Sequence, residues 1–225
     1  GLGSALAATA IAPASYDYRE LETGNMLVSW PLGADATRRY GAPLYNIHRA
    51  DLIDLLRRAL PTGTVHVASK VASFAQDASA VHATLATGQT LDADVLIGAD
   101  GIHSVVRKQL RGDESTQFSN ILMWRSLVSA EAVESLHLEE RGNYWTGPGR
   151  TIISYWVRPR KLYSILASVP AAEVHRESWT DSGDVEDLLR SFHGAEPRVM
   201  KMLEAVETSF ITGMYYRDPI DRWTY

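Results

Sequence analysis

Two short segments of this chain combine residue types that could hold a charged ligand. The first, residues 48–52, reads His-Arg-Ala-Asp-Leu and opens a stretch whose leucines have helical spacing. An arginine at a helix start can pair with a phosphate through its planar guanidinium group. The plainer interpretation is a solvated Arg49, with Asp51 in the first turn because the helix dipole favours a carboxylate there.

The second segment, residues 98–107, reads Gly-Ala-Asp-Gly-Ile-His-Ser-Val-Val-Arg and follows the apolar run 94–98, which is typical of a buried strand. Its glycines would let the backbone turn sharply and approach a ligand closely. Asp100 would then stand at the carboxyl end of the strand, where open α/β sheets bind ligands. A helix beginning near Ser104 would offer free N–H groups to an anion. The plainer interpretation is an ordinary strand–turn–helix.

Other chemistries find no support in the sequence. The 225 residues include no cysteine, which excludes disulfides, thiol nucleophiles and cysteine-ligated metals and suits a reducing cytoplasm. The seven histidines lack metal-ligand spacing, so we expect no metal site, and Ser104 and Ser154 lack the context of a hydrolase nucleophile. The net charge of −5 gives no reason to expect nucleic acid. No apolar run approaches the roughly 20 residues that span a membrane, so we expect no membrane partner.

The elements that must position these residues follow from periodicity and turn signals. The hydrophobic share of 45% is enough for a sizeable core at this length. In the first half we expect a helix in 1–10, a hairpin over 16–32 with its turn at 23–25, an extended segment at 45–47, a helix over 49–59, short strands at 65–67, 71–76 and 81–85, the buried strand 94–98 and a helix over 104–110. In the second half we expect strands at 118–128, 151–157, 162–169 and 210–215, with helices over 185–192 and after Pro197.

In this order, the two motifs resemble those of the FAD-dependent aromatic hydroxylases, the single-component flavoprotein monooxygenases that include salicylate hydroxylase. Members carry H-R-x-x-L, then a β-meander, then a strand that ends in G-A-D-G-x-x-S-x-x-R, as in residues 48–52 and 98–107 here. Residues 216–223 also look like the segment that precedes the last flavin motif of the family. The resemblance covers nearly the whole chain.

The resemblance assigns cofactor roles to five residues. It implies that Arg49 contacts the phosphate and ribitol region of FAD, and that Val71 holds the adenine through its backbone. It places Asp100 and Gly101 along the pyrophosphate and ribityl side of FAD. Arg107 matches an arginine thought to assist the nicotinamide cofactor.

A strand in the second half is the candidate for the substrate face. Residues 151–157 alternate, so Thr151, Ile153, Tyr155 and Val157 should share one side. In the similar 6-hydroxynicotinate 3-monooxygenase, a histidine and a tyrosine of this strand face the substrate. Tyr155 matches that tyrosine and is our candidate catalytic residue, whereas Thr151 stands at the histidine position, which argues against that same substrate. The plainer interpretation is that Tyr155 is an ordinary sheet aromatic.

Two family motifs do not occur in these residues: the G-x-G-x-x-G that follows the first strand, and the closing G-D-A-x-H. Residues 1–6 fit the glycine pattern only superficially, since no strand precedes them. We therefore expect an internal fragment of a hydroxylase that by itself neither holds flavin nor turns over. A homodimer is left open.

The fold expected for the intact protein is α/β, with a partial FAD-binding domain carrying a β-meander insertion and a β-rich, largely antiparallel substrate domain. We assign 1–115 to the FAD-binding domain, with the hairpin near 16–32 joining the substrate domain, 116–215 to the substrate domain, and 216–225 to the FAD-binding domain again.

The resemblance implies hydroxylation of a phenolic or hydroxypyridine carboxylate. NAD(P)H would reduce FAD, and dioxygen would form a flavin C4a-hydroperoxide that transfers oxygen to the ring. The alternatives are another enzyme of the same flavin fold, such as a halogenase or a reductase, a nicotinamide-only dehydrogenase, for which the nucleotide fingerprint is missing, and a non-catalytic isolated fragment.

Overall fold

A computed structural model describes residues 1–112, 114–159, 161–171 and 181–224. The chain divides into two compact units. The first contains residues 1–60 and 120–214, and the second contains residues 61–119 and 215–225. The fold is mixed α/β, with one large and one small sheet, as the sequence predicts.

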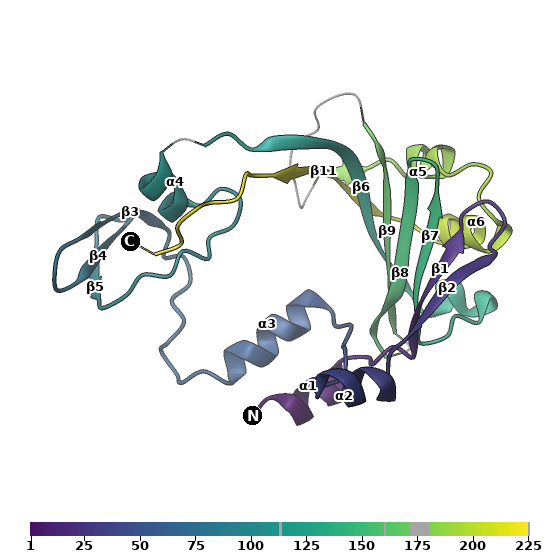
Figure 1. Ribbon diagram of the computed structural model, residues 1–225, viewed down its shortest axis with the longest axis horizontal. Helices are drawn as coiled ribbons and strands as arrows, with labels where there is room; N and C mark the ends of the chain where they lie inside the picture. The colour runs from purple at the N-terminus through teal and green to yellow at the C-terminus, as the bar shows by residue number, and fades with distance from the viewer. Residues whose placement is uncertain (113, 160, 172–180, 225) are drawn as a thin grey trace. The chain divides into compact units, whose positions relative to one another are not determined.

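The first unit is built on an eight-stranded sheet of order β10-β11-β6-β9-β8-β7-β1-β2 (Figure 1). The described pairings are antiparallel except that of β1 with β7, which is parallel. The predicted hairpin is confirmed and joins this sheet through β1. The strands are β1 (Ser15–Glu20), β2 (Met26–Pro31), β6 (Gln117–Ser129), β7 (Gly142–Gly147), β8 (Arg150–Arg158), β9 (Leu162–Pro170), β10 (Ser182–Gly183) and β11 (Ser209–Tyr216).

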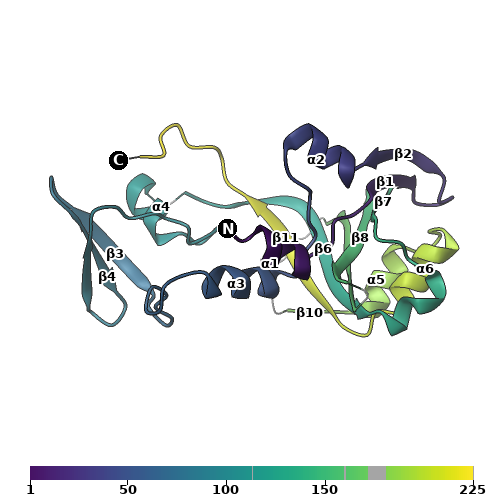
Figure 2. The same cartoon turned by 90° about the horizontal axis from the view of Figure 1, so that it is seen from below.

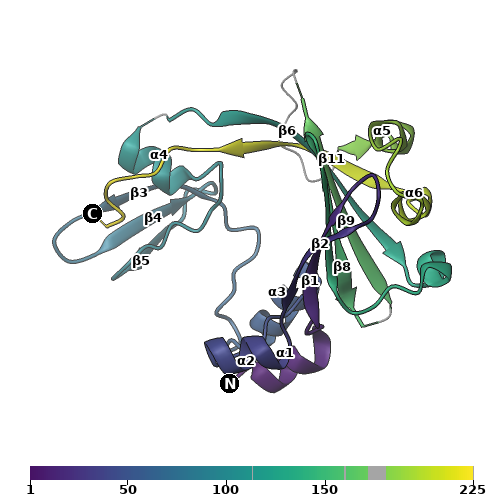
Figure 3. The same cartoon turned by 45° about the vertical axis from the view of Figure 1, so that its right-hand side comes forward.

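Helices cover one face of this sheet (Figure 3). Asp184 accepts a hydrogen bond from the Glu186 amide and so caps α5 (Val185–Ser191). Pro197 at the first turn of α6 (Pro197–Glu204) is preset for a helix start. The buried faces of α5 and α6 meet the sheet in one core, to which each fully buried large side chain contributes about 1.5–3 kcal/mol. This core includes Ile152, Trp156, Leu188, Phe192, Val199, Met202 and Leu203.

Four further helices complete the first unit: α1 (Gly3–Thr9), α2 (Ala34–Tyr40), α3 (Arg49–Arg58) and the 3₁₀ helix η1 (Glu131–Leu136). The expected helices at 1–10 and 49–59 are confirmed. Sequence periodicity missed α2, η1 and β7, each of six or seven residues, because so short a window holds too few repeats of either period. At the expected extended segment, Asn46 forms a single antiparallel bridge with Ile11.

The second unit contains a three-stranded antiparallel meander, β3 (Val71–Gln76), β4 (Val81–Leu85) and β5 (Thr90–Ala93), and the helix α4 (Val105–Arg111). Figure 2 shows β3 and β4 side by side. The expectation of a strand at 65–67 is wrong, since these residues form none. The third meander strand is β5 instead, because the turn at 87–89 returns the chain along β4 and pairs Thr90 with Thr84.

The expectation of a buried strand at 94–98 is also wrong. These residues form no strand, and the side chains of Val95 and Ile97 are 71% and 82% exposed. A strand forms only when neighbouring strands satisfy its backbone N–H and C=O groups, and no described segment pairs with this one. The side chains of this apolar run are therefore exposed to solvent, although its composition is typical of a strand inside a sheet.

A histidine between two carboxylates links β4 and β5. The Nδ1 atom of His82 lies 2.7 Å from Asp92 Oδ1, and its Nε2 atom lies 3.2 Å from Asp77 Oδ2. The hydrogen bonds to Asp92 and Asp77 raise the pKa of His82 above its ordinary value. Because the folded-state pKa is raised, the stabilisation is complete below about pH 6.5, the unperturbed value, and is lost as the pH rises through the folded-state pKa.

We predict that Asp92→Asn lowers the pKa of His82, because it removes the nearer carboxylate. The measurement is an NMR titration of the His82 ring protons in wild type and variant. Asp94→Asn changes an exposed carboxylate of the same segment and serves as the matched control. A midpoint that is the same in wild type and Asp92→Asn would contradict the assigned pairing.

Candidate functional site

Strand β8 presents its two faces to different surroundings. Ile152 and Ser154 are 0% exposed and lie on the face that α5 and α6 cover. Thr151, Ile153 and Tyr155 alternate with them and are half-buried on the opposite, open face. The hydroxyl of Tyr155 has no hydrogen-bond partner within the described residues, so it is free to meet a ligand on that face.

The expected alternation ends one residue after Tyr155. The register shifts between Trp156 and Arg158, so Val157, expected to resemble Tyr155, is 5% exposed. A bulge of this kind places an extra residue on one strand and redirects the side chains beyond it. The expectation that Val157 shares the environment of Tyr155 is therefore wrong.

A group of tyrosines surrounds the open face near Tyr155. The rings of Tyr18 and Tyr144 stack at 4.7 Å, and Tyr16 meets Tyr144 edge-on at 5.5 Å. The Tyr16 hydroxyl donates a hydrogen bond of 2.9 Å to Asn46 Oδ1. Sequence reasoning missed this group, although the alternation of Tyr16 and Tyr18 within the predicted hairpin was a signal that one strand face is aromatic.

The environment of Tyr16 keeps its phenol protonated. Burial raises the pKa of Tyr16 to about 12, with further contributions from Tyr144 and Tyr155. At neutral pH Tyr16 is therefore a neutral hydrogen-bonding group.

Helix α3 is fixed to the end of β8 by two contacts. The amide of His48 donates to the Val157 carbonyl at 3.0 Å, and Arg158 binds Asp51 through two hydrogen bonds of 2.6 and 2.7 Å. The hydrogen bond from Arg158 lowers the pKa of Asp51, so this carboxylate stays charged. The strand that carries Tyr155 and the helix that begins at Arg49 are thus joined within one unit.

Arg49 is the exposed first residue of α3, and its guanidinium has no hydrogen bond or ion pair within the described residues. Arg57 and Arg58, at the other end of the same helix, both pair with Asp54. The unpaired state of Arg49 leaves all five donors of its planar group for an external anion. In addition, the Nδ1 atom of His48 is buried without a partner in the described part of the chain.

The turn at 98–101 is shaped by its glycines. Gly101 has a φ of +78°, a backbone conformation that residues with a side chain rarely adopt. At Gly98 a Cβ would stand 2.8 Å from Cγ1 of Val106, so only glycine lets the chain pass α4 this closely. A side chain at either position would displace the turn that carries Asp100.

Asp100 caps helix α4. Its carboxylate accepts hydrogen bonds from the Ser104 hydroxyl at 2.5 Å and from the Val105 amide at 2.7 Å. Burial by itself would raise the pKa of Asp100, but these hydrogen bonds outweigh it and hold the pKa below the usual value. Ser104 is the N-cap of α4, since its side chain accepts a hydrogen bond from the Arg107 amide. Asp100 is therefore a charged carboxylate with a structural role of its own.

The remaining two predicted cofactor residues lie near α4 in the second unit. Arg107 donates from Nε to Glu114 at 2.7 Å and from Nη2 to the Asp218 carbonyl at 2.9 Å, so it ties α4 to the C-terminal segment. Val71 opens β3, an edge strand of the meander, whose outward backbone groups pair with no other strand among the described residues. The structure thus groups Val71, Asp100, Gly101 and Arg107 in one unit, and Arg49 and Tyr155 in the other.

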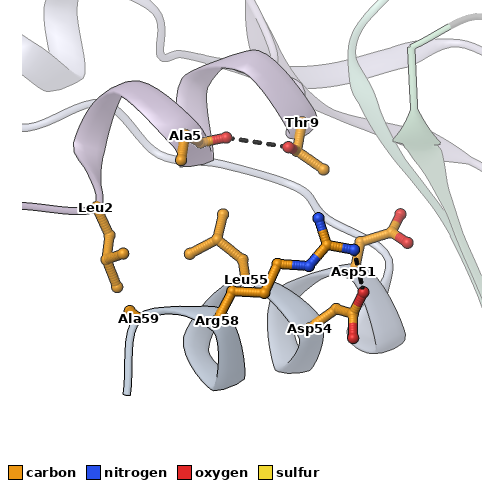
Figure 4. A pocket seen from close by; sticks show the side chains of 8 residues that line it. All are labelled: Leu2, Ala5, Thr9, Asp51, Asp54, Leu55, Arg58 and Ala59. Carbon is orange, nitrogen blue, oxygen red and sulfur yellow. Dashed lines mark hydrogen bonds and ion pairs between the residues drawn. The ribbon is translucent and has the colours of Figure 1, made fainter. Parts of the chain in front are cut away.

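A hollow of about 350 Å³ lies between α1 and α3 and is lined in part by Leu2 and Leu55 (Figure 4). Its charged lining residues are Asp51, Asp54 and Arg58, and Arg58 already pairs with Asp54. Among the lining residues, the one basic side chain, Arg58, is therefore already paired.

Residues 43–208 match a family model described as FAD binding domain. The chain belongs to this FAD-binding family. Among its relatives is the 3-amino-4-hydroxybenzoate 2-monooxygenase PtnB3 of Streptomyces platensis, at 31% identity over 100% of this chain and 56% of the relative. Another is the 6-hydroxynicotinate 3-monooxygenase of Pseudomonas fluorescens, at 28% identity over 92% of this chain and 54% of the relative. The chain spans about half the length of these curated relatives.

Solved structures of flavoproteins share the fold of this family member. Klebsiella pneumoniae HpxO complexed with FAD and uric acid matches 99% of this chain and 57% of that chain, with a TM-score of 0.83 and 23% identity. A salicylate hydroxylase substrate complex matches 96% of this chain and 57% of that chain, with a TM-score of 0.77 and 23% identity. The resemblance drawn from the two sequence motifs is confirmed at the level of family and fold.

In the residues that the structure describes, no helix is long and apolar enough to cross a membrane. The same residues contain no group of three or more His, Asp or Glu side chains arranged to hold a metal ion.

Proposed function

We propose that the protein containing this chain uses FAD, NAD(P)H and dioxygen to hydroxylate a phenolic or hydroxypyridine carboxylate. The observation that carries this proposal is Tyr155, whose unpartnered hydroxyl lies among tyrosines on the open sheet face of an FAD-binding chain. The relatives named as monooxygenases of hydroxylated aromatic acids support the reaction class. We place the protein in the cytoplasm, and the absence of cysteine is in keeping with this.

Four residues would hold FAD, and a fifth would assist the nicotinamide cofactor. Arg49 would bind the phosphate and ribitol region of FAD through its unpaired guanidinium group. Val71 would bind the adenine through the backbone of its edge strand. Asp100 and Gly101 form a tight turn that would lie along the pyrophosphate and ribityl side of FAD. Arg107 would assist the nicotinamide cofactor from its fixed position on α4. Bound FAD, once reduced, supplies the activation of dioxygen.

The contribution of this chain to the reaction is to bind and orient the ring. The open face is aromatic, which suits a flat substrate because aromatic pairs gain about 0.5–1.5 kcal/mol beyond area burial. The Tyr155 hydroxyl would hydrogen-bond the substrate hydroxyl and help to hold or move its proton, which raises the electron density of the ring. A halogenase or reductase of the same fold would not require this contact.

Replacing Tyr155 by phenylalanine tests the proposal. We expect Tyr155→Phe to slow ring hydroxylation by about ten- to a hundredfold, because general acid–base contacts contribute about 10²-fold or more. The substitution keeps the aromatic ring and removes only the hydroxyl. Anaerobic reduction of the flavin by NADH, followed by absorbance, should keep its rate. Candidate substrates are 3-amino-4-hydroxybenzoate, 6-hydroxynicotinate and salicylate, with product measured by chromatography.

Tyr40→Phe is the matched control, because Tyr40 is 67% exposed on α2. It should leave both rates as in wild type. Equal rates of hydroxylation in wild type and Tyr155→Phe would assign Tyr155 to packing. Turnover of none of the three acids by the wild-type protein would count against the substrate class.

A further inference from the structure

Strand β7 lacks a side chain at the point where the ring of Tyr16 crosses it. The β1–β7 register pairs Tyr16 with Gly142. A Cβ atom at Gly142 would stand 2.0 Å from Cδ1 and 2.1 Å from Cε1 of Tyr16, a separation that atoms cannot adopt. The ring of Tyr16 therefore occupies the space that any other residue at 142 would fill.

Tyr155 flanks Gly142 from the opposite strand. Ser154 of β8 pairs with Asn143, so the next residue, Tyr155, continues the register toward Gly142. Tyr16 and Tyr155 thus flank Gly142 from the two sides of β7, on the same open face of the sheet. The missing side chain at 142 is what brings two phenols from non-adjacent strands together.

The two hydroxyls differ in what they can offer a ligand. Tyr155 has an unengaged hydroxyl, which can donate or accept. Tyr16 donates the proton of its hydroxyl to Asn46 Oδ1 at 2.9 Å. Toward a ligand, the oxygen of Tyr16 can therefore act only as a hydrogen-bond acceptor.

We infer that Tyr16 is a specificity-determining residue, which selects a phenolic ring carrying a second hydrogen-bond donor, an amino or hydroxyl group, beside the hydroxyl bound by Tyr155. This inference rests on the proposed function, since it places the substrate ring on the Tyr155 face. A ring without that second donor covers the oxygen of Tyr16 without giving it a hydrogen bond, and covering a polar atom without a partner costs binding affinity.

Two nearly isosteric rings test the inference: 3-amino-4-hydroxybenzoate, which carries the donor, and 4-hydroxy-3-methylbenzoate, which does not. Dissociation constants are measured by calorimetry on the flavin-loaded protein that contains this chain. We expect the wild-type protein to prefer the amino compound by about three- to tenfold, the effect of one neutral hydrogen bond. Tyr16→Phe should abolish this preference, so that the two compounds bind with about equal dissociation constants, because the substitution keeps the ring and removes the acceptor oxygen.

Gly142→Ala should have the same effect on the preference, since its Cβ displaces the ring of Tyr16. The control is Gly147→Ala in the same strand, where a new Cβ would meet the Glu22 carboxylate oxygens at 2.9 and 3.1 Å and Leu21 Cβ at 3.2 Å, but not Tyr16. It should keep the wild-type preference. A general loss of stability would weaken both rings alike and leave their ratio unchanged.

The outcomes separate the inference from the proposed function. An amino-over-methyl preference that survives in Tyr16→Phe overturns the inference alone. If neither ring binds the wild-type protein, the proposed substrate class fails and the inference fails with it. Should Gly142→Ala fold poorly, Tyr16→Phe still decides, because it adds no atoms to the strand.

Discussion

Residues 1–225 expressed by themselves should bind no stoichiometric FAD and should show no NADH oxidation stimulated by an aromatic acid. The FAD pyrophosphate is normally held by a glycine-rich loop after a strand and by the helix N-terminus that follows it. These residues contain no such loop after a strand. The apolar run at 94–98 also has no strand partner in the described structure, with Val95 and Ile97 exposed.

The measurement is the flavin absorbance of the purified chain after incubation with excess FAD, together with NADH consumption in the presence of salicylate. The full-length 6-hydroxynicotinate 3-monooxygenase of Pseudomonas fluorescens, treated in the same way with its own substrate, is the positive control. A fluorescent dye that binds apolar surface should report the exposed run. Stoichiometric FAD on residues 1–225 would show that the remaining contacts suffice and would contradict this expectation.

The second large effect is expected from Arg49→Ala in the protein that contains this chain. Arg49 is exposed, begins α3 and has no partner within the described residues. If it pairs with an FAD phosphate, its removal should cost about 1.5–3 kcal/mol, or roughly ten- to hundredfold in FAD affinity, as is typical of hydrogen bonds to charged groups. Fluorescence titration of the apoprotein with FAD measures the change.

Arg57→Ala is the matched control, because Arg57 lies on the same helix and pairs with Asp54 instead. It should leave FAD affinity unchanged. Asp100→Ala should also weaken FAD binding, but it uncaps α4 as well, so Arg49→Ala gives the cleaner result. Retention of FAD at wild-type strength in both Arg49→Ala and Asp100→Ala would remove these residues from the cofactor site.

The sequence by itself determined the elements whose signal is local. Helix α3 was predictable from leucine spacing, the meander strands β3 and β4 from alternation, and α4 from the Ser104 cap. The family was also readable, because two motifs in the right order around a meander are specific. The assignment of residues 1–115 and 216–225 to a flavin domain and of 116–215 to a substrate domain remains a prediction, since it concerns the assembled protein.

Only the tertiary structure decided which of the candidate groups are already engaged and which are free. Arg49 and Arg107 look alike in sequence, yet Arg107 is committed to Glu114 while Arg49 has no partner within the described residues. The run at 94–98 reads as a buried strand, but a strand requires a neighbour, and neighbours are a property of the whole sheet. Periodicity cannot report on contacts that lie between distant segments.

The approach of Tyr16 to Tyr155 belongs to this second category. Residue 16 is far in the sequence from residues 142 and 155, and nothing local marks Gly142 as the gap that the ring of Tyr16 fills. The parallel register of β1 with β7 and the antiparallel register of β7 with β8 bring the three together. Cross-strand register is fixed by the packing of the whole sheet, and for that reason the sequence could nominate Tyr155 but not its neighbour.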